Sequence, residues 1–481
     1  MKRKVRVSLP VLMAALLASC TVGPRYTKPS VPAAPAYSEQ PPQNFTEANG
    51  WKTAQPGDTQ LRPAWWELFN DPQLNSLEVE VPVANPTLQA AEASFRQARA
   101  LIQLNRSNLY PNVGIAPDIS SNRISAHNPT GAAGYQYGLF SLPLDVSFDA
   151  DLWGRIRRTI ATAKEQTQAA AADIENVKLE LQSDLAVDYF ESRSLDRQKQ
   201  ILDDTVIAFR KALQLTQNRF NGGVASKAEV AQAQTQLNQT EAQDIDVGVA
   251  RREFEHAIAV LVGKTPEEFR LETRPLTEAP PAIPVALPSQ LLERRPDIAR
   301  QERLVAAANE QIGIARTAFF PDLVLSATAG FSSGSIASWF AWPSRFWAVG
   351  PQVAQTVFDA GRRRAQLASA QAAYDVTVGN YRQTALSAFQ EVEDNLSSLR
   401  ILEAESAKQH EASMAAENSL QLALNRYKGG LVTYLEVISA QSIALTNERT
   451  EADLLRRRMN ATVLLIKALG GGWDSSKLPS V

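Results

Sequence analysis

A tandem repeat covers most of this chain of 481 residues. Residues 218–224 read NRFNGGV and residues 425–431 read NRYKGGL, and each stretch joins two long helical patterns. Turn-forming and marker residues recur at a fixed distance. The offset is 210 residues for Pro86/Pro296, Pro111/Pro321 and Phe148/Phe358, and 207 residues for Gly154/Gly361, Gly223/Gly430 and Gly263/Gly470. One three-residue gap explains the change of offset, so we infer an internal duplication.

Each copy has the pattern of a helix, two strands, and two long helices joined by a glycine pair. In the first copy a helix is expected from about residue 86 to 110, where Pro111 ends it. Residues 155–220 contain no Pro or Gly and predict a helix on the order of 100 Å long. A second helix is expected from about 226 to 261. Because glycine accepts the left-handed conformation that ends a helix, the sequence predicts two antiparallel hairpins with Gly-Gly tips.

The strand patterns alternate apolar residues with small or polar ones. They cover about residues 112–120 and 135–149 in the first copy, where a change of phase near Leu139-Phe140 predicts a β-bulge, and 323–332 and 347–357 in the second. One interpretation is a two-stranded ribbon packed on a soluble core; the other is a transmembrane barrel with its apolar face toward lipid. We favour the barrel because Trp339, Trp342, Phe346 and Trp347 gather beside the last strand, as aromatic residues do at a membrane surface.

About four strands per chain are too few to close a barrel. A sheet in a bilayer must leave no bare edge, and closed barrels of this kind need about eight strands or more. The barrel must therefore be shared by at least two chains, and this count does not distinguish two from three.

The N-terminus has the pattern of a secretion signal. Residues 1–19 join a basic start to a short apolar core, and Cys20, the chain's single cysteine, follows at the cleavage position. This arrangement resembles a bacterial lipobox, in which Cys20 becomes the lipidated first residue. Thr21 in place of Asp indicates the outer membrane, and a single cysteine excludes a disulfide within the chain. Residues 20–63 are rich in Pro and predict an extended tether.

These patterns divide the chain into six segments. They are a signal peptide (1–19), a lipidated Pro-rich tether (20–63), a first repeat (64–263), a Pro-rich crossing (264–295), a second repeat (296–470) and a C-terminal tail (471–481).

Motifs for catalysis, metal binding or nucleic acid are weak. His127, His256 and His410 lack metal-ligand spacing, and residues 330–334 match G-x-S-x-G without the strand-turn-helix context that a hydrolase needs. The net charge is only −2, and the arginine triplets at 362–364 and 456–458 lie in helical patterns without aromatic stacking partners. We therefore expect no enzyme activity, no cofactor, no metal and no nucleic-acid partner.

The chain resembles the TolC-like outer-membrane efflux proteins, in their lipoprotein (NodT-like) branch. The matching features are Cys20 with Val22-Gly23-Pro24, the Trp65-Trp66 motif, residues 148–155 (FDADLWGR), residues 287–298 (LPSQLLERRPDI), both Gly-Gly tips and the closing residues 469–473 (LGGGW). The resemblance covers essentially the whole mature chain.

The resemblance implies an α+β membrane protein that assembles as a homotrimer. Three chains would share a twelve-stranded transmembrane β-barrel continuous with a long periplasmic α-helical barrel, with the Pro-rich crossing around its waist. The protein would be lipid-anchored in the outer membrane, would extend into the periplasm, and would meet a periplasmic adaptor that links it to an inner-membrane pump, expected to be of the RND type.

The resemblance also implies two sets of site residues near the tips. The adaptor contacts would be Gly222, Gly223, Val224, Ala225 and Ser226 with Gly429, Gly430, Leu431, Val432 and Thr433. The periplasmic gate would involve Glu229, Tyr427, Glu436 and Ser439. Carboxylates repeated around a narrow ring would favour cations.

Three positions depart from the family pattern. Ser439 stands where the family usually has Asp, which removes a ring carboxylate. Leu455 stands where some members place an Arg that latches the mouth, with Arg456 next to it. Pro82 interrupts a stretch that the family runs as one helix, and it should break or kink that helix.

The sequence thus predicts the outer-membrane channel of a tripartite efflux system that exports small molecules such as drugs. One alternative is the outer-membrane channel of a type I protein secretion system, because the fold alone does not decide the cargo. An alternative of another class is a periplasmic coiled-coil adaptor or structural rod, which would lack lipid-patterned strands.

Overall fold

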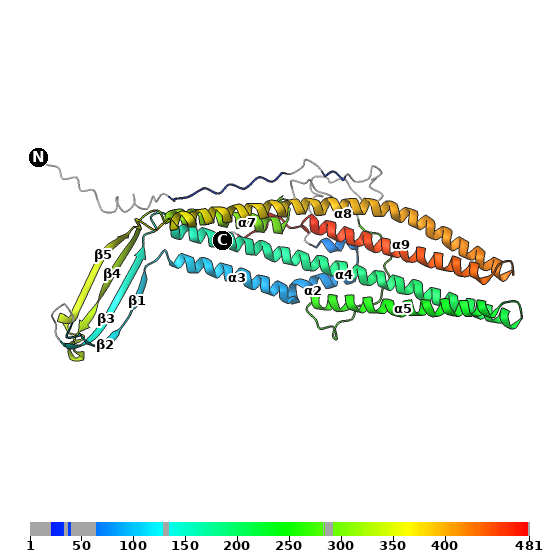
Figure 1. The fold of residues 1–481 in the computed structure, drawn as a ribbon, viewed down its shortest axis with the longest axis horizontal. Helices are drawn as coiled ribbons and strands as arrows, with labels where there is room; N and C mark the ends of the chain where they lie inside the picture. The colour runs from blue at the N-terminus through cyan, green and yellow to red at the C-terminus, as the bar shows by residue number, and fades with distance from the viewer. Residues whose placement is uncertain are drawn as a thin grey trace.

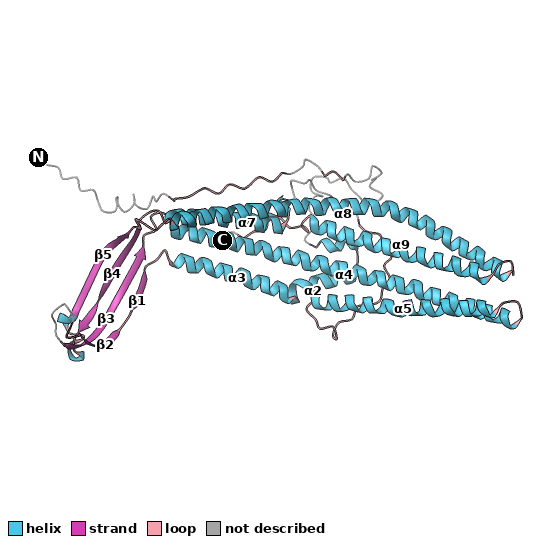
Figure 2. Cartoon of the chain, in the orientation of Figure 1, coloured by secondary structure: helices cyan, strands magenta, loops and turns pink. Residues whose placement is uncertain are grey.

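The protein is an elongated body with a β-sheet at one end and two helical hairpin tips at the other (Figures 1 and 2). The computed structural model describes residues 21–32, 37–39, 64–127, 134–281, 283 and 292–479. Cys20, the signal peptide and most of the tether therefore lie outside the described residues. No helix in the described ranges combines the length and apolarity needed to cross a membrane.

The helices of the two repeats have matching lengths, which confirms the tandem repeat. The pairs are α3 (Pro86–Ser107) with α7 (Pro296–Thr317), 22 residues each; α4 (Arg155–Asn221) with α8 (Arg362–Lys428), 67 residues each; and α5 (Lys227–Leu261) with α9 (Tyr434–Ala468), 35 residues each. In the half near the sheet, α3, α4, α7 and α8 lie side by side in that order; in the half near the tips, α5 packs on α4, α4 on α9, and α9 on α8 (Figure 1). The repeats thus form one layer whose two edges are α3/α5 and α8.

The long helices begin at left-handed glycines. Gly154 precedes α4 with φ 82° and Gly361 precedes α8 with φ 89°, a conformation that glycine adopts at little cost. A carboxylate caps each start: Asp151 accepts from the backbone N–H of Arg157, and Asp359 from that of Arg363. The three-residue gap between the copies falls here, since Gly154 follows Phe148 by six residues and Gly361 follows Phe358 by only three.

The sheet contains five antiparallel strands. They are β1 (Asn112–Ile115), β2 (Asp118–Arg123), β3 (Gln136–Asp149), β4 (Asp322–Ser333) and β5 (Arg345–Ala354). β1 and β2 both pair with β3, β3 pairs with β4, and β4 pairs with β5. The first predicted strand is thus split in two at Pro117, which has no N–H to donate. The split strand still occupies one position, so four strand positions cross the sheet.

The predicted bulge near Leu139-Phe140 is absent. β3 keeps one register against β1 and β2, from Asn112↔Ser147 through Ile119↔Phe140 to Arg123↔Gln136. The polarity changes at this point because β4 ends opposite Phe140, whose ring then meets Trp339 of the loop between β4 and β5. The change in the apolar/polar alternation therefore reflects the replacement of β4 by Trp339 as the neighbour of β3, and not an inserted residue.

The largest core lies at the waist of the body. It joins the short 3-10 helix η2 (Trp65–Phe69) and α2 (Pro72–Ala84) to the middle of α4, the ends of α5 and α9, and residues 269–283 of the crossing. Trp65 is 1% exposed at its centre. Three further 3-10 turns are η3 (Ile336–Ser338), η4 (Trp342–Ser344) and η5 (Ser475–Lys477).

The helix break expected at Pro82 lies three residues further on. Pro82 stays inside the last turn of α2, and the chain leaves the helix at Asn85, directly before Pro86. Asn85 accepts hydrogen bonds from the N–H groups of Thr87 and Leu88, and its own amide donates to the Leu261 carbonyl. The residue before a proline avoids the helical conformation, and this cap fixes the new helix start.

Candidate functional site

The sheet has one polar face and one apolar face. Directly paired residues of an antiparallel sheet point to the same side, so the strand registers assign every side chain. One face carries mostly small or polar residues: Asn112, Gly114, Asp145, Ser147, Asp149, Ser326, Thr328, Gly330, Ala348, Gly350 and Gln352, with Pro143, Val324 and Phe346 as larger apolar exceptions. The other carries apolar ones: Val113, Ile115, Leu144, Val146, Phe148, Leu323, Leu325, Ala327, Phe331, Trp347, Val349, Pro351 and Val353. Several of the latter are fully open, with Trp347 75% and Val349 72% exposed.

A hollow of about 700 Å³ lies along the polar face. Small residues such as Gly114, Ser326 and Gly350 line it and leave the space that larger side chains would fill. At the far end of the sheet, Trp339 stacks on Phe340 at 4.9 Å, and Arg345 lies 3.6 Å over the ring of Trp342. The sheet therefore has one surface suited to water and one suited to an apolar surrounding, with aromatic side chains at its far end.

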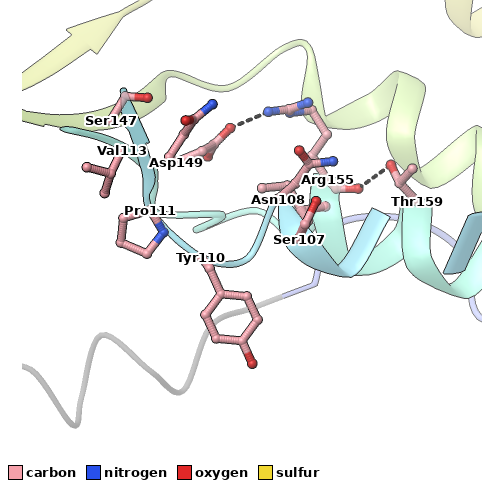
Figure 3. A pocket seen from close by; sticks show the side chains of 11 residues that line it. Ser107, Asn108, Tyr110, Pro111, Val113, Ser147, Asp149, Arg155 and Thr159 are labelled. Carbon is pink, nitrogen blue, oxygen red and sulfur yellow. Dashed lines mark hydrogen bonds and ion pairs between the residues drawn. The ribbon is translucent and has the colours of Figure 1, made fainter. Parts of the chain in front are cut away.

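A second polar hollow, of about 530 Å³, continues this face at the junction of sheet and helices. Figure 3 shows Asp149 at the end of β3 paired with Arg155 at the start of α4, and Thr159 bonded to the Arg155 carbonyl. The junction is braced by Trp153, whose indole N–H donates to the Pro321 carbonyl at 2.8 Å and whose ring stacks on Phe320. The polar surface thus runs without a break from strands to helices.

The two hairpin tips present small and apolar residues at the other end of the body. Gly223 (φ 72°) and Gly430 (φ 75°) take the left-handed conformation that the turn requires. Next to them Val224 is 69% and Leu431 75% exposed. Ser226 caps α5 with a reciprocal pair of hydrogen bonds to Glu229, so the turn has a defined shape.

Tyr427 lies buried between the two hairpins. Its side chain is 2% exposed and its hydroxyl lies 3.2 Å from the Thr216 hydroxyl of α4. The Arg219 guanidinium sits 4.5 Å over its ring and donates to its carbonyl at 2.7 Å. Tyr434 packs beside it at 5.4 Å, and burial raises the pKa of Tyr434 to about 12. This cluster joins the first hairpin to the second.

The other predicted gate residues do not gather around Tyr427. The Glu229 carboxylate accepts from the Ser226 N–H as part of the helix cap. Glu436 pairs with Arg426 at 3.3 Å at the surface of the second tip, and Ser439 is exposed one turn further along α9. Within one chain, Tyr427 therefore packs against Thr216, Arg219 and Tyr434, and the carboxylates of Glu229 and Glu436 lie apart from it.

Leu455 and Arg456 lie far from the tips. They stand in α9 roughly 33 Å along the helix from its first residue. Arg456 pairs with Glu191 in the middle of α4 and with Asp453. One turn away on α4, burial and the neighbouring Asp184 and Glu191 raise the pKa of Asp188 to about 6. Arg456 thus links two helices near the waist.

Thr216 and Arg219 are contacts that the sequence patterns did not single out. A signal was present, because both tips carry an Arg before the aromatic residue (Arg219-Phe220 and Arg426-Tyr427). The sequence does not reveal which copy's aromatic residue is buried. Within the described residues no group of acidic, His or Cys side chains is arranged to hold a metal ion.

Comparisons with known proteins agree with this geometry. The outer membrane efflux protein family matches residues 80–264 and 287–471, one match for each repeat. The solvent efflux pump outer membrane protein SrpC of Pseudomonas putida is 30% identical over 476 residues, which cover 98% of this chain and 99% of the relative. The cation efflux system protein CusC of Escherichia coli O6:H1 is 29% identical over 477 residues, 97% and 98% of the two chains.

Solved structures show the same fold. The outer-membrane channel OprN has a TM-score of 0.87 at 29% identity, covering 94% of this chain and 100% of that one. A structure of CusC has a TM-score of 0.82 at 26% identity, covering 94% and 100%. The two family matches, one for each repeat, together cover most of the chain, and the relatives match it over nearly its whole length. The chain belongs to the outer membrane efflux protein family.

Proposed function

We propose that three copies of this chain form a lipid-anchored channel through which a tripartite pump exports small, largely apolar molecules across the outer membrane. The observation that carries the proposal is the sheet, which has one apolar face, one polar face and two edges without partners among the described strands. Bare edges are not stable in lipid, so β5 of one copy would pair with β1 and β2 of the next. Three copies of four strand positions would give twelve strands.

The free edges of the helical layer support the same assembly. On α3, Leu101 and Leu104 are 43% and 62% exposed on the side away from α4, and on α8 Val376 and Leu386 are 61% and 48% exposed. Apolar side chains on both edges favour contact between copies. A closed ring would cover them and leave the polar face inside.

The different burial of Tyr427 and Phe220 at the two tips also supports a ring-shaped assembly. Tyr427 is buried against Thr216 and Arg219 of its own chain, whereas its counterpart Phe220 is 41% exposed. The counterparts of Thr216 and Arg219, 207 residues later, are Ala423 and Arg426. In a ring of alternating hairpins, Phe220 would pack on Ala423 and Arg426 of the next subunit, and Tyr427 would close the mouth within each subunit.

The position of Thr21 supports lipid attachment at Cys20. Thr21 lies beside Gly154 at the junction of sheet and helices, and the next N–H, that of Val22, donates to the Trp153 carbonyl. The following residues run along the body, where Lys28 pairs with Glu302 at 2.8 Å. The residue before Thr21 would therefore sit at the membrane surface, where an acyl chain could insert.

The tips are the proposed docking surface for a periplasmic adaptor. Each chain has two tips, residues 222–226 with Val224 and residues 429–433 with Leu431. A trimer would therefore present six tips, each with an exposed apolar side chain. Together they would form a surface that helical hairpins of an adaptor, and through it an RND-type inner-membrane pump, can meet. Glu229, Glu436 and Ser439 would lie around the mouth and influence which ions pass.

Efflux is favoured over protein secretion because SrpC and CusC are both named as efflux proteins. Apolar solvents and drugs are the proposed cargo, by analogy with the relative named for solvent efflux. The test is a deletion strain: sensitivity to solvents and dyes should rise and be restored by the intact gene. Purified protein should also conduct ions across a planar bilayer, and the absence of conductance would refute the channel.

A further inference from the structure

A groove outside the polar surface remains open where the sheet meets the helices. It encloses about 630 Å³ between the end of α3 and the start of α4. Its floor is apolar, with Leu109 and Ile160, and its rim carries Tyr110, Arg106, Arg157 and Lys164.

The groove and the polar hollow open on different sides of α4 and meet at Tyr110, which lines both. On α4 the polar hollow is lined by Arg155, Ile156 and Thr159, and the groove by Arg157, Ile160, Ala161 and Lys164. Because each residue turns a helix by about 100°, the two sets are centred well over 100° apart around α4. Figure 3 shows the Tyr110 ring pointing away from the Asp149–Arg155 pair. The groove therefore continues the apolar face of the sheet.

The groove has unbalanced positive charge. Arg106 and Lys164 have no hydrogen bond or ion pair to a side chain in the described part of the chain, and no acidic residue lines the cavity. The Nε atom of Arg157 pairs with Asp151 at 3.1 Å, but its side chain remains 36% exposed. Three cations around an apolar floor are complementary to a phosphate attached to a hydrocarbon chain.

The duplication repeats two of the three cations of the groove, whereas Lys164 corresponds to Gln371. Arg316 is the counterpart of Arg106 and Arg364 that of Arg157, at the same offsets as the rest of the repeat. The neighbouring groove between α4 and α7 is filled by the chain itself: a Cβ atom at Gly23 would lie 2.7 Å from the Cα atom of Gly313. The α3–α4 groove has no such filling among the described residues.

Assembly would leave the groove open. Leu104, on the proposed subunit contact, and Arg106 are two residues apart on α3 and so about 200° apart around the helix. A neighbouring subunit on the free edge of α3 would thus meet Leu104 and not the groove.

We propose that this groove binds the headgroup of an anionic phospholipid, phosphatidylglycerol, from the periplasmic leaflet of the outer membrane; the proposal rests on the proposed membrane position of the sheet. Arg106, Arg157 and Lys164 hold the phosphate, and the guanidinium groups donate paired hydrogen bonds to its oxygens. Leu109 and Ile160 cover the first carbons of the acyl chains, and Tyr110 lies at the interface.

The test uses the full chain, purified in dodecyl maltoside and titrated with dioleoyl phosphatidylglycerol while native mass spectrometry counts bound lipids. The variant is Arg106→Gln with Lys164→Gln. The matched control is Arg96→Gln with Lys178→Gln, the same charge change on the same two helices further from the sheet. At roughly fivefold per cation near a phosphate surface, the variant should bind about 30-fold more weakly, and the control should bind like the wild type.

The outcomes separate the lipid site from the channel. Equal lipid binding by variant and control would overturn the site, as would equal binding of dioleoyl phosphatidylcholine, or displacement of the lipid by millimolar inorganic phosphate. Bilayer conductance is measured on the same samples. If lipid binding changes as expected but no sample conducts, the channel is refuted and the lipid site is supported. If the protein conducts but the variant binds lipid like the wild type, the lipid site is refuted and the channel is supported.

Discussion

Replacement of Arg219 by Ala should loosen the mouth of the channel. In the structure Arg219 joins the first hairpin to the second through a 2.7 Å hydrogen bond to the Tyr427 carbonyl and a contact of 4.5 Å with the Tyr427 ring. A hydrogen bond from a charged group contributes about 1.5–3 kcal/mol, and a cation–π contact at a partly exposed site about 0.5–1 kcal/mol. The variant should therefore lose about 2–4 kcal/mol of contact between the hairpins in each subunit.

In the proposed trimer, three subunits that open together would multiply this loss. A change of about 6–12 kcal/mol exceeds the roughly 5.5 kcal/mol that moves a two-state equilibrium from 1:99 to 99:1. Single-channel conductance of the Arg219→Ala variant in planar bilayers should therefore rise to that of an open mouth. Cells that carry it should become more sensitive to vancomycin, a large antibiotic, than cells that carry the wild-type channel.

The control is Arg210→Ala on the same helix. Arg210 pairs with Glu241 at 2.7 Å within the first hairpin, and its side chain is 63% exposed. Such surface pairs contribute about 0–1 kcal/mol, and this one does not connect the two hairpins. Tyr427→Phe should give an intermediate result, because it removes one hydrogen bond of about 1 kcal/mol while Thr216 still donates to the Ala212 carbonyl. If Arg219→Ala and Arg210→Ala conduct alike, this interface does not hold the mouth closed.

Three further predictions follow from other parts of the chain. Ser439→Asp should add a ring of carboxylates and raise cation over anion permeability, measured as a shift of reversal potential in a KCl gradient; an unchanged potential would place residue 439 outside the pore. Burial raises the pKa of Glu78 well above its usual value, so its contribution to stability is full below about pH 4.5 and is lost as the pH rises. Glu78→Gln should therefore raise the melting temperature at pH 8 more than at pH 5. An equal shift at both pH values would contradict a buried, neutral Glu78. A Phe220→Cys, Ala423→Cys double variant should form disulfide-linked dimers and trimers on oxidation, whereas either single variant should not; monomers alone would exclude the proposed contact between neighbouring hairpins.

The sequence predicted the helical part of the fold almost to the residue, because its signals are local. Gly154, Gly223 and Gly361 mark helix ends through their left-handed backbone conformation, and a 67-residue stretch without Pro or Gly has few alternatives to a helix. The sheet was predicted less well. Its alternation depends on which strand or loop faces each residue, so the polarity change at Phe140 predicts a bulge although the register is continuous.

The tip cluster was the least accessible from the sequence. Tyr427 was identified, but the sequence does not specify whether an aromatic residue at a repeat tip faces its own chain or the next. The Thr216 and Arg219 contacts arise from the packing of two hairpins that are 207 residues apart, and no local pattern encodes that packing. The effect of Pro82 was misplaced for a similar reason: the break depends on Asn85, whose amide reaches the Leu261 carbonyl of a distant helix.

The two copies of the repeat share a backbone, so the side chains in which they differ decide what each interface does. Two residues precede the glycine pair of each tip: Phe220 and Asn221 in the first tip, and Tyr427 and Lys428 in the second. Phenylalanine can only pack, whereas tyrosine can pack and also bond to Thr216, so the contact within a subunit has a hydroxyl hydrogen bond that the proposed contact between subunits would lack. Polar contacts break and reform with less loss than apolar ones when water enters, because water replaces their hydrogen bonds. We therefore expect opening to begin between the two hairpins of each subunit at Tyr427, while the contacts at Phe220 hold the three subunits together.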